Sequence, residues 1–440
     1  MTNSIQFNKD YPKITTSEAI FKRAQKLIPC QTQMLAKGYQ QHSKGVCPIY
    51  LERGKGSHVW DVDGNEYLDL TMGMGPMSLG YCYPQVDQAV KDQIEKGMNF
   101  TLIDPIEVEV AELIHELIPN AEKIRYSKAG ADITSAAVRT ARASTGRDQV
   151  ICCGYHGWHD WYIGTTNRNR GIPKAVRELT TKIPYNDIEA LKKALTPDTA
   201  CFILEPVVFE EPKPGYLEEV QKLCKANGTL LIFDEIWTGF RIALGGAQEH
   251  YGIKPDLATY SKACANGLPI AILTGKADVM NVMEEDDFFF FTTFGGETLS
   301  LAATKATLLE MKEKDVPTKS AQKSAKLRDG FNAIAQQLDM TYVRSIGLDY
   351  RTMITISTDR GNPLELKTLL QQELIKRGVL WTGFHHISHS HTDEEIQYVL
   401  DAYQDALPVL KKAVDENTVK TMLVGEPVHP VFRNLGIGQH

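Results

Sequence analysis

The sequence predicts an α/β protein whose larger part is a mostly parallel β-sheet with helices on both faces. Between about residues 105 and 311, short apolar segments typical of buried strands alternate with longer segments of helical periodicity. This alternation indicates strand–helix–strand units, in which successive strands run parallel. After residue 312 the pattern changes to charged helices and short strands, which predicts a smaller α+β domain.

The predicted elements follow one another in a regular order. Residues 16–29 predict a helix, and an Asp-Gly-Asn turn at 63–65 within the alternating segment 57–75 predicts a β-hairpin. Helices are then expected at 107–119, 132–146 and 215–228, and buried strands at 149–153, 200–206 and 229–235. The smaller domain is expected to contain a charged helix at 313–338, strands near 342–356, and helices at 363–377 and 392–415.

Composition and charge argue against several classes of function. The net charge is −7 and the pI is about 6.0, so no basic field favours nucleic acid. No run of about 18 apolar residues is present to span a membrane, and residues 1–13 lack the pattern of a signal peptide. The eight cysteines include no CxxC pair, which indicates buried apolar roles in a reducing compartment. We therefore expect a cytoplasmic protein.

Three apolar segments of the predicted sheet end in polar side chains. Glu205 ends one segment, Asp234 and Glu235 end the next, and Lys262 ends the stretch DLATYSK. Ligands of open parallel sheets bind beyond the carboxyl ends of the strands, so we expect a polar site there.

Lysine is seldom buried, because desolvating an ammonium is costly. Burial lowers its pKa, and the neutral amine can then attack a carbonyl.

A lysine of this kind is typical of one cofactor chemistry. Pyridoxal 5′-phosphate (PLP) needs a lysine for its Schiff base, an acid beside the ring nitrogen, a phosphate clamp and flat side chains around the ring. The chain carries the segments VWDVDGNEYLDL (59–70), DEIWTGFR (234–241), KPDLATYSK (254–262) and TTFGGE (292–297). With these segments it resembles the class III aminotransferases, which are fold-type I PLP enzymes. The resemblance is greatest to the glutamate-1-semialdehyde aminomutase branch and extends from about residue 20 to residue 410.

The resemblance implies a fold and its division into parts. It implies a seven-stranded, mixed but mostly parallel sheet in a large PLP-binding domain at 76–311. The smaller α+β domain is implied to combine an N-terminal segment, 1–75, with a C-terminal segment, 312–440.

The resemblance also implies roles for individual residues. Lys262 matches the Schiff-base lysine, and Asp234 matches the partner of the ring nitrogen. The other cofactor contacts that it implies are Ile236 and Tyr155 on the two faces of the ring, His156 after Tyr155, and Glu205 near the ring oxygen. Thr293 matches a hydroxyl that reaches the phosphate of the neighbouring subunit, which implies a homodimer with shared active sites.

The phosphate-binding segment departs from the pattern of this branch. Its usual Ser-Gly-Thr is replaced by Ala129, Gly130 and Ala131, so both hydroxyls are missing. The backbone N–H groups of Gly130 and Ala131, at a helix N-terminus, are left to hold the phosphate. Ser127 and Lys128 are candidates to compensate.

The residues expected to contact the substrate also depart from the pattern of the aminomutase branch. An arginine that binds the substrate carboxylate in the aminomutase is matched by Lys37, a point charge without a bidentate fork. Residues 378–396 contain four histidines, namely His385, His386, His389 and His391. They lack the HExxH spacing, so we expect no metal. They are interpreted either as a pocket wall that hydrogen bonds a hydroxylated substrate or as structural histidines, and Thr392 with Glu395 predicts a capping box.

The resulting hypothesis is a PLP-dependent aminotransferase. Its expected donor is an amino acid, glutamate first, and its expected acceptor is a small polar aldehyde or ketone, such as an oxo sugar or polyol phosphate used for polysaccharide precursors. Lys262 moves the proton while Asp234 keeps the ring nitrogen protonated. Two alternatives stay open, a glutamate-1-semialdehyde 2,1-aminomutase and a PLP-binding protein without enzymatic activity. A nicotinamide enzyme is disfavoured, because GMGPMSLG (73–80) is not a GxGxxG motif.

Overall fold

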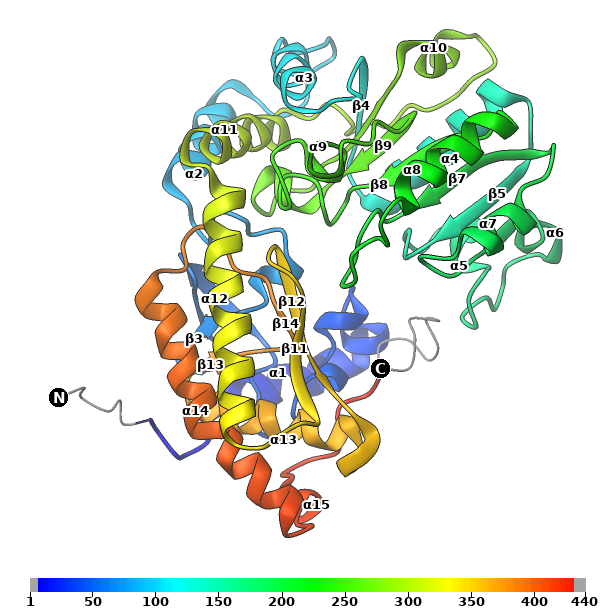
Figure 1. Cartoon of the computed structure of the whole chain (residues 1–440). Helices are drawn as coiled ribbons and strands as arrows, with labels where there is room; N and C mark the ends of the chain where they lie inside the picture. Colours follow the sequence, from blue (N-terminus) through cyan, green and yellow to red (C-terminus); the bar gives the residue numbers. More distant parts are fainter. Residues whose placement is uncertain (1–6, 431–440) are drawn as a thin grey trace.

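The computed structural model describes residues 7–430, which form a larger lobe around one wide sheet and a smaller lobe around two narrow sheets (Figure 1). The signal-peptide prediction concerned residues 1–13, of which 1–6 lie outside the described part of the chain. No helix within residues 7–430 combines the length and the apolar character that crossing a membrane requires.

The wide sheet has seven strands in the order β4-β10-β9-β8-β7-β5-β6. They are β4 (Lys123–Ser127), β5 (Gln149–Cys153), β6 (Thr180–Lys182), β7 (Thr199–Leu204), β8 (Leu230–Asp234), β9 (Leu257–Tyr260) and β10 (Ala271–Gly275). β10 is antiparallel to both of its neighbours, and all other pairs are parallel. The prediction of a seven-stranded, mixed but mostly parallel sheet is therefore confirmed.

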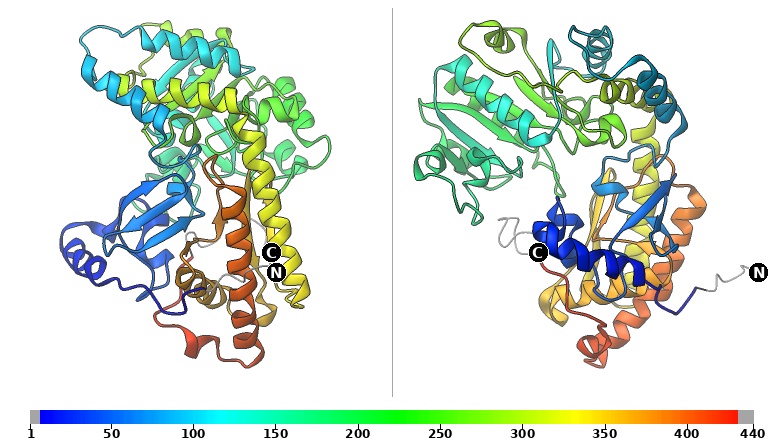
Figure 2. Two further views of the ribbon diagram at one scale, coloured as in Figure 1. Left: turned by 90° about the vertical axis from the view of Figure 1, so that its left-hand side faces the viewer. Right: turned by 180° about the vertical axis from the view of Figure 1, so that it is seen from behind.

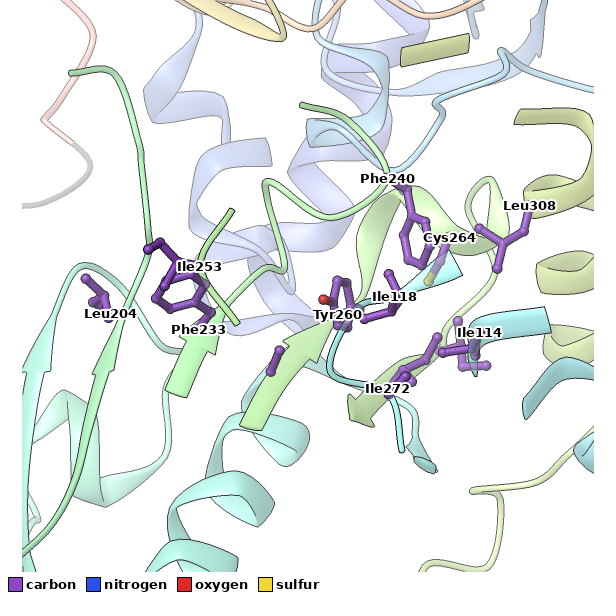
Figure 3. Packing of buried hydrophobic residues seen from close by; sticks show 14 of the residues in the cluster. Ile114, Ile118, Leu204, Phe233, Phe240, Ile253, Tyr260, Cys264, Ile272 and Leu308 are labelled. Atoms are coloured by element: carbon purple, nitrogen blue, oxygen red, sulfur yellow. The ribbon is translucent and has the colours of Figure 1, made fainter. Parts of the chain in front are cut away.

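Helices cover both faces of this sheet. They are α2 (Pro84–Lys96), α3 (Ile106–Leu117), α4 (Gly130–Thr145), α5 (Asp160–Ile163), α6 (Lys174–Arg177), α7 (Ile188–Ala194), α8 (Tyr216–Asn227), α9 (Gly246–Tyr251), α10 (Ala277–Met280) and α11 (Thr298–Lys314). Side chains alternate between the faces along each strand. Phe233 packs in one core with Ile114 of α3 and Leu308 of α11 (Figure 3), whereas Ile232 packs in the other core with α4.

The smaller lobe is built from both ends of the chain. One sheet pairs β1 (Leu51–Lys55), β2 (His58–Asp61), β3 (Glu66–Asp69) and β13 (Val379–Leu380), and the other pairs β11 (Val343–Leu348), β12 (Arg351–Ile356) and β14 (Phe384–His385). Its helices are α1 (Thr15–Leu27), α12 (Val316–Gln337), α13 (Pro363–Lys376), α14 (Asp393–Asp415) and α15 (Val419–Met422). β13 runs parallel to β3, so the N-terminal hairpin lies against the C-terminal segment (Figure 2).

Three local predictions are confirmed in these lobes. β2 and β3 form the expected hairpin. The Thr392 hydroxyl accepts from the backbone N–H of Glu395, whose carboxylate accepts from the backbone N–H of Thr392, so the capping box begins α14. Six of the eight cysteines are buried and all eight are free thiols, as apolar packing roles require.

Candidate active site

Lys262 lies just beyond the carboxyl end of β9, at the edge of the wide sheet. Its φ of 45° is a left-handed conformation that non-glycine residues seldom adopt, and such strain often occurs at functional sites. Its side chain is partly buried, with Nζ 4.1 Å from the centroid of the Trp237 ring. Burial lowers the pKa of Lys262 to about 7, against the opposing effect of Asp234. A neutral, nucleophilic amine is therefore available near neutral pH.

Asp234 ends β8 and is almost completely buried. His156 lies against it, with Nδ1 2.7 Å from Oδ2 of the carboxylate. The other ring nitrogen, Nε2, lies 3.1 Å from the carbonyl oxygen of Cys153, which only accepts, so Nε2 carries a proton. A second proton lies between Nδ1 and Asp234, while Oδ1 accepts from the backbone N–H of Ile236 at 3.1 Å. These contacts fix a carboxylate and a shared proton where a ring nitrogen can meet them.

Glu205 and Tyr155 border the same edge of the sheet. Oε2 of Glu205 accepts from the backbone N–H of Tyr155 at 2.9 Å. Burial, and then the charge of Asp234, raises the pKa of Glu205. A Cβ at Gly154 would lie 2.7 Å from Oε2 of Glu205, so only glycine leaves room for this carboxyl group. The Tyr155 side chain packs edge-on against Tyr162 and remains 41% exposed, which leaves ring surface open to a ligand.

The N-terminus of α4 lies at the position where the phosphate site is expected. α4 begins at Gly130, and its N-cap residue, Ala129, provides no side-chain cap for the first N–H groups. A Cβ at Gly130 would lie 2.9 Å from Cδ1 of Ile236, and one at Gly157 would lie 2.7 Å from Cβ of Ala131. The two glycines therefore allow the helix end to approach the strand-end loops closely.

Neither candidate for compensation points freely toward this helix end. Nζ of Lys128 forms an ion pair with Oε1 of Glu297 at 2.7 Å. The Ser127 hydroxyl is buried, 3.4 Å from a carboxylate oxygen of Asp132. A phosphate bound at α4 would therefore meet mainly backbone N–H groups and the helix dipole.

Restoring the two missing hydroxyls is expected to tighten cofactor binding. In Ala129→Ser combined with Ala131→Thr, two hydroxyl donors join the backbone N–H groups, and we expect the Kd for PLP to fall about tenfold. Equilibrium titration of the cofactor-free protein measures the change. A control variant, Ser135→Ala, removes a hydroxyl of α4 that already bonds His159 and Trp161. Unchanged or weaker affinity in the double variant would contradict this interpretation of the helix end.

Glu235 does not join the other polar strand ends. Its carboxylate accepts from the Thr238 hydroxyl and the Ala247 backbone N–H, each at 2.6 Å, and from the Gln248 N–H at 3.1 Å. Burial raises the pKa of Glu235 to about 7. The expectation of one site containing every polar strand end is thus corrected, since Glu235 turns away and anchors the start of α9.

His386 extends the site into the smaller lobe. Its ring lies 5.0 Å from the Trp237 ring and stacks on Phe384 at 5.8 Å. Burial, together with the charge of Arg351, lowers the pKa of His386 well below its ordinary value, so the ring is neutral. Nδ1 donates to the carbonyl oxygen of Thr71 at 3.1 Å, and Nε2 is buried without a partner among residues 7–430. Nε2 is therefore an acceptor that a substrate hydroxyl or N–H group can use.

The other three histidines contact neighbouring protein side chains, although His389 Nδ1 and His391 Nε2 are also buried without a partner among residues 7–430. His385 is hydrogen bonded through both ring nitrogens, to Thr352 at 2.9 Å and Tyr403 at 2.8 Å. Nδ1 of the buried His391 lies 2.9 Å from the Ser388 hydroxyl. The His389 ring packs against Tyr83, at a centroid distance of 6.3 Å. Residues 7–430 contain no group of three or more His, Cys, Asp or Glu side chains that could hold a metal ion.

Two predicted residues are not brought to this site within one chain. Lys37 is exposed on a 3₁₀ turn, Leu35–Lys37, and its amine forms no ion pair with a residue of 7–430. Thr293 is exposed in the loop before α11. In contrast, Trp237 and Arg351 contact one another at the site although sequence reasoning missed both. Trp237 lay in a quoted motif, next to Ile236, but Arg351 belongs to no motif.

The residues present fit PLP. The edge of the sheet offers a neutral amine, a buried carboxylate with a shared proton, an uncapped helix N-terminus and an accessible aromatic face. This donor set matches the aldehyde, ring nitrogen, phosphate and ring faces of that cofactor.

Comparisons with known proteins agree with this geometry. The sequence pattern of the family Aminotransferase class-III matches residues 39–407. A 3-aminobutyryl-CoA aminotransferase of Cloacimonas acidaminovorans (strain Evry) is 36% identical over 414 residues, which are 91% of this chain and 98% of the relative. A glutamate-1-semialdehyde 2,1-aminomutase of Archaeoglobus fulgidus is 33% identical over 424 residues, 90% of this chain and 100% of the relative. The PLP internal aldimine form of the Sphingopyxis sp. MTA144 FumI protein has a TM-score of 0.85 at 26% identity, and the match covers 94% of this chain and 99% of that one.

Proposed function

The chain belongs to the class-III aminotransferase family of PLP-dependent enzymes, and we propose that it carries an amino group from glutamate to a small polar aldehyde or ketone, such as an oxo sugar or polyol phosphate. The observation that carries this proposal is the pair of polar side chains, His386 and Arg351, that contact the same Trp237 ring as Lys262. His386 contributes a neutral, unpaired acceptor nitrogen there, and Arg351 contributes a buried positive charge. An apolar substrate would leave both groups unsatisfied, at a cost in binding free energy.

The side chains at the sheet edge have distinct tasks in amino transfer. PLP, when bound, supplies the electron sink that stabilises negative charge on the substrate carbon. Nζ of Lys262, with its pKa lowered to about 7, takes up and returns the proton of that carbon. Asp234, oriented by His156 and by the backbone N–H of Ile236, holds a proton on the ring nitrogen. The N–H groups at the start of α4 bind the phosphate.

Two half-reactions test this proposal. L-Glutamate added to the holoenzyme should convert the cofactor to its amine form, followed by absorbance, with release of 2-oxoglutarate. Dihydroxyacetone phosphate, glyceraldehyde 3-phosphate and the apolar ketone 2-pentanone are then offered as acceptors. We expect the polar compounds to restore the original absorbance and 2-pentanone to fail. Preference for 2-pentanone would overturn the assignment of a polar acceptor.

An aminomutase is a second candidate function. It is supported by the relative of that name in Archaeoglobus fulgidus, which is 33% identical and matched over its full length. Such an enzyme would isomerise glutamate 1-semialdehyde with no external amino donor. Rapid isomerisation under those conditions would favour this candidate over transfer between two molecules.

We further expect a homodimer with shared sites, because apolar side chains are exposed on both sides of Thr293. Phe291 and Phe294 are each 60% exposed, and Leu102 is 82% exposed. The Leu102 loop is tied to the start of α11, since the Thr298 backbone N–H donates to the carbonyl oxygen of Met98 at 3.0 Å. A second copy of the chain would cover this surface and receive the Thr293 hydroxyl.

Analytical ultracentrifugation tests the dimer. The wild type should sediment at twice the 49.2 kDa of one chain. Phe291→Glu should give monomers and weaken PLP binding, and Thr293→Ala should weaken PLP binding about tenfold while leaving the dimer intact. Met422→Glu, an exposed position in the smaller lobe, is the matched control. A monomeric wild type would refute the shared site.

A further inference from the structure

Arg351 is a buried cation without a hydrogen-bond acceptor among residues 7–430. It begins β12 and is only 8% exposed. Its side chain forms no ion pair or hydrogen bond with a residue of 7–430, and its Nε is buried without a partner. Burying a guanidinium is costly unless an acceptor is supplied, and this burial lowers the pKa of Arg351. The missing acceptor is therefore expected to come from a ligand.

Aromatic rings hold this guanidinium in place. Its Cζ lies 3.8 Å from the ring centroid of Trp237, 4.3 Å from that of Phe209 and 5.5 Å from that of Phe384. The rings of Phe209 and Phe384 stack at 5.8 Å with an interplanar angle of 14°. Ring faces attract a cation, but they cannot replace hydrogen-bond acceptors for the N–H groups of the guanidinium. Arg351 is therefore preorganised, with its donors left for a planar anion.

Trp237 connects Arg351 with the reacting amine. Nζ of Lys262 lies 4.1 Å from the centroid of the same indole, and Cζ of Arg241 lies 5.6 Å from it. Arg241 donates to the carbonyl oxygen of Gly75, and neither arginine is ion-paired with a carboxylate of residues 7–430. Burial, and then the charge of Arg351, lowers the pKa of Arg241 to about 10. The charges of both arginines oppose those of Asp234 and Glu205 at Lys262, so positive and negative groups meet around its amine.

We propose that Arg351 binds the carboxylate of the amino substrate through its guanidinium fork and so selects acidic amino substrates. This inference rests on the proposed aminotransferase function and names one determinant of its substrate. The guanidinium carbon lies 3.8 Å and the lysine amine 4.1 Å from the centroid of the same indole, so the two groups are close enough for one small substrate to meet both. Two parallel N–H···O bonds to a carboxylate satisfy the fork. Arg351 thus takes the role that the sequence had suggested for Lys37.

A pair of amines with the same carbon skeleton tests the assignment. 3-Aminobutanoate carries a carboxylate where 2-aminobutane carries a methyl group. In the half-reaction of the holoenzyme, we expect Arg351→Met to lower kcat/KM for 3-aminobutanoate about 100-fold, because one partner of a buried charge pair is lost. The rate with 2-aminobutane should not fall. Arg351→Lys should retain part of the activity toward 3-aminobutanoate, and Arg344→Met, at an exposed position on β11, should behave as the wild type.

A binding measurement separates this inference from the proposed function. 3-Methylbutanoate has the carboxylate but no amine, and calorimetry of the holoenzyme should detect its binding to the wild type and Arg344→Met but not to Arg351→Met. If it binds in this way while no amine is turned over, the proposed function fails and the inference stands. The assignment would be overturned if 3-methylbutanoate did not bind to the wild type or bound equally well to Arg351→Met. It would also be overturned if the wild type bound inorganic phosphate more tightly than 3-methylbutanoate. If Arg351→Met lost PLP, the guanidinium would instead be assigned to cofactor binding and not to substrate binding.

Discussion

Replacing Lys262 with alanine is expected to abolish amino transfer, with kcat lower by at least about 10⁴-fold. The variant loses both the covalent anchor and the group that moves the proton. Stopped-flow absorbance of the half-reaction with L-glutamate measures the loss. PLP should still bind through α4 and Asp234, but borohydride should no longer fix it to the protein.

Two controls make this result specific to Lys262. Lys367 is also a lysine whose pKa is lowered by burial, to about 8, so Lys367→Met tests whether losing any buried amine is sufficient. We expect Lys367→Met to keep its activity.

In wild-type protein freed of cofactor, the rate of covalent PLP loading should rise as the pH passes about 7, because the depressed pKa of Lys262 makes its amine neutral above that pH. Normal turnover by Lys262→Ala, or loading that rises only near the ordinary lysine pKa, would contradict the assignment.

Asp234→Asn is expected to lower kcat about 10³-fold with little change in overall stability. Asparagine keeps the shape and can accept from the Ile236 N–H, but it carries no charge to hold a proton on the ring nitrogen. The loss should appear in kcat rather than in KM, since the charge is needed when the carbon is deprotonated. Single-turnover kinetics with L-glutamate separates these effects.

The matched control for this carboxylate is at the other end of the strands. Asp256 accepts from the Leu231 backbone N–H at 2.8 Å and pairs with Lys276. Asp256→Asn should therefore affect stability slightly and kcat not at all. His156→Gln should give an intermediate loss, because it removes the shared proton but leaves the carboxylate. A wild-type kcat in Asp234→Asn would exclude the proposed role.

The wide sheet and the centre of the site were predictable because local patterns determine them. Short apolar strands that end in Glu205, Asp234 and Lys262 must bring those residues to one edge of a parallel sheet. The helix α4 was expected close to its observed start. Ala129 and Ala131 also showed in the sequence that the two hydroxyls usual at this helix end are missing. The hairpin turn and the Thr392 capping box depend on a few neighbouring residues, so they were predictable too.

The features that could not be predicted from the sequence depend on contacts between residues far apart in the chain. α11 was not among the predicted helices, because its buried residues include polar Thr298, Ser300 and Thr304, and no apolar stripe marks one face. Glu235 immediately follows Asp234 in the chain, and only the position of α9 shows that its carboxylate turns away. Arg351 carries no local pattern, and its role depends on rings contributed by distant segments.

The pairing of β13 with β3 has a consequence for the order in which the protein matures during synthesis. Every strand of the wide sheet lies between residues 123 and 275, whereas β3, already paired with β2, must wait for residues 379–380 before its second neighbour, β13, exists. A nascent chain can therefore assemble the lysine and carboxylate edge well before the smaller lobe closes. Arg351 and His386 emerge from the ribosome later, so the capacity to hold a cofactor precedes the capacity to discriminate among substrates. Cofactor binding to ribosome-bound chains of increasing length would reveal this order.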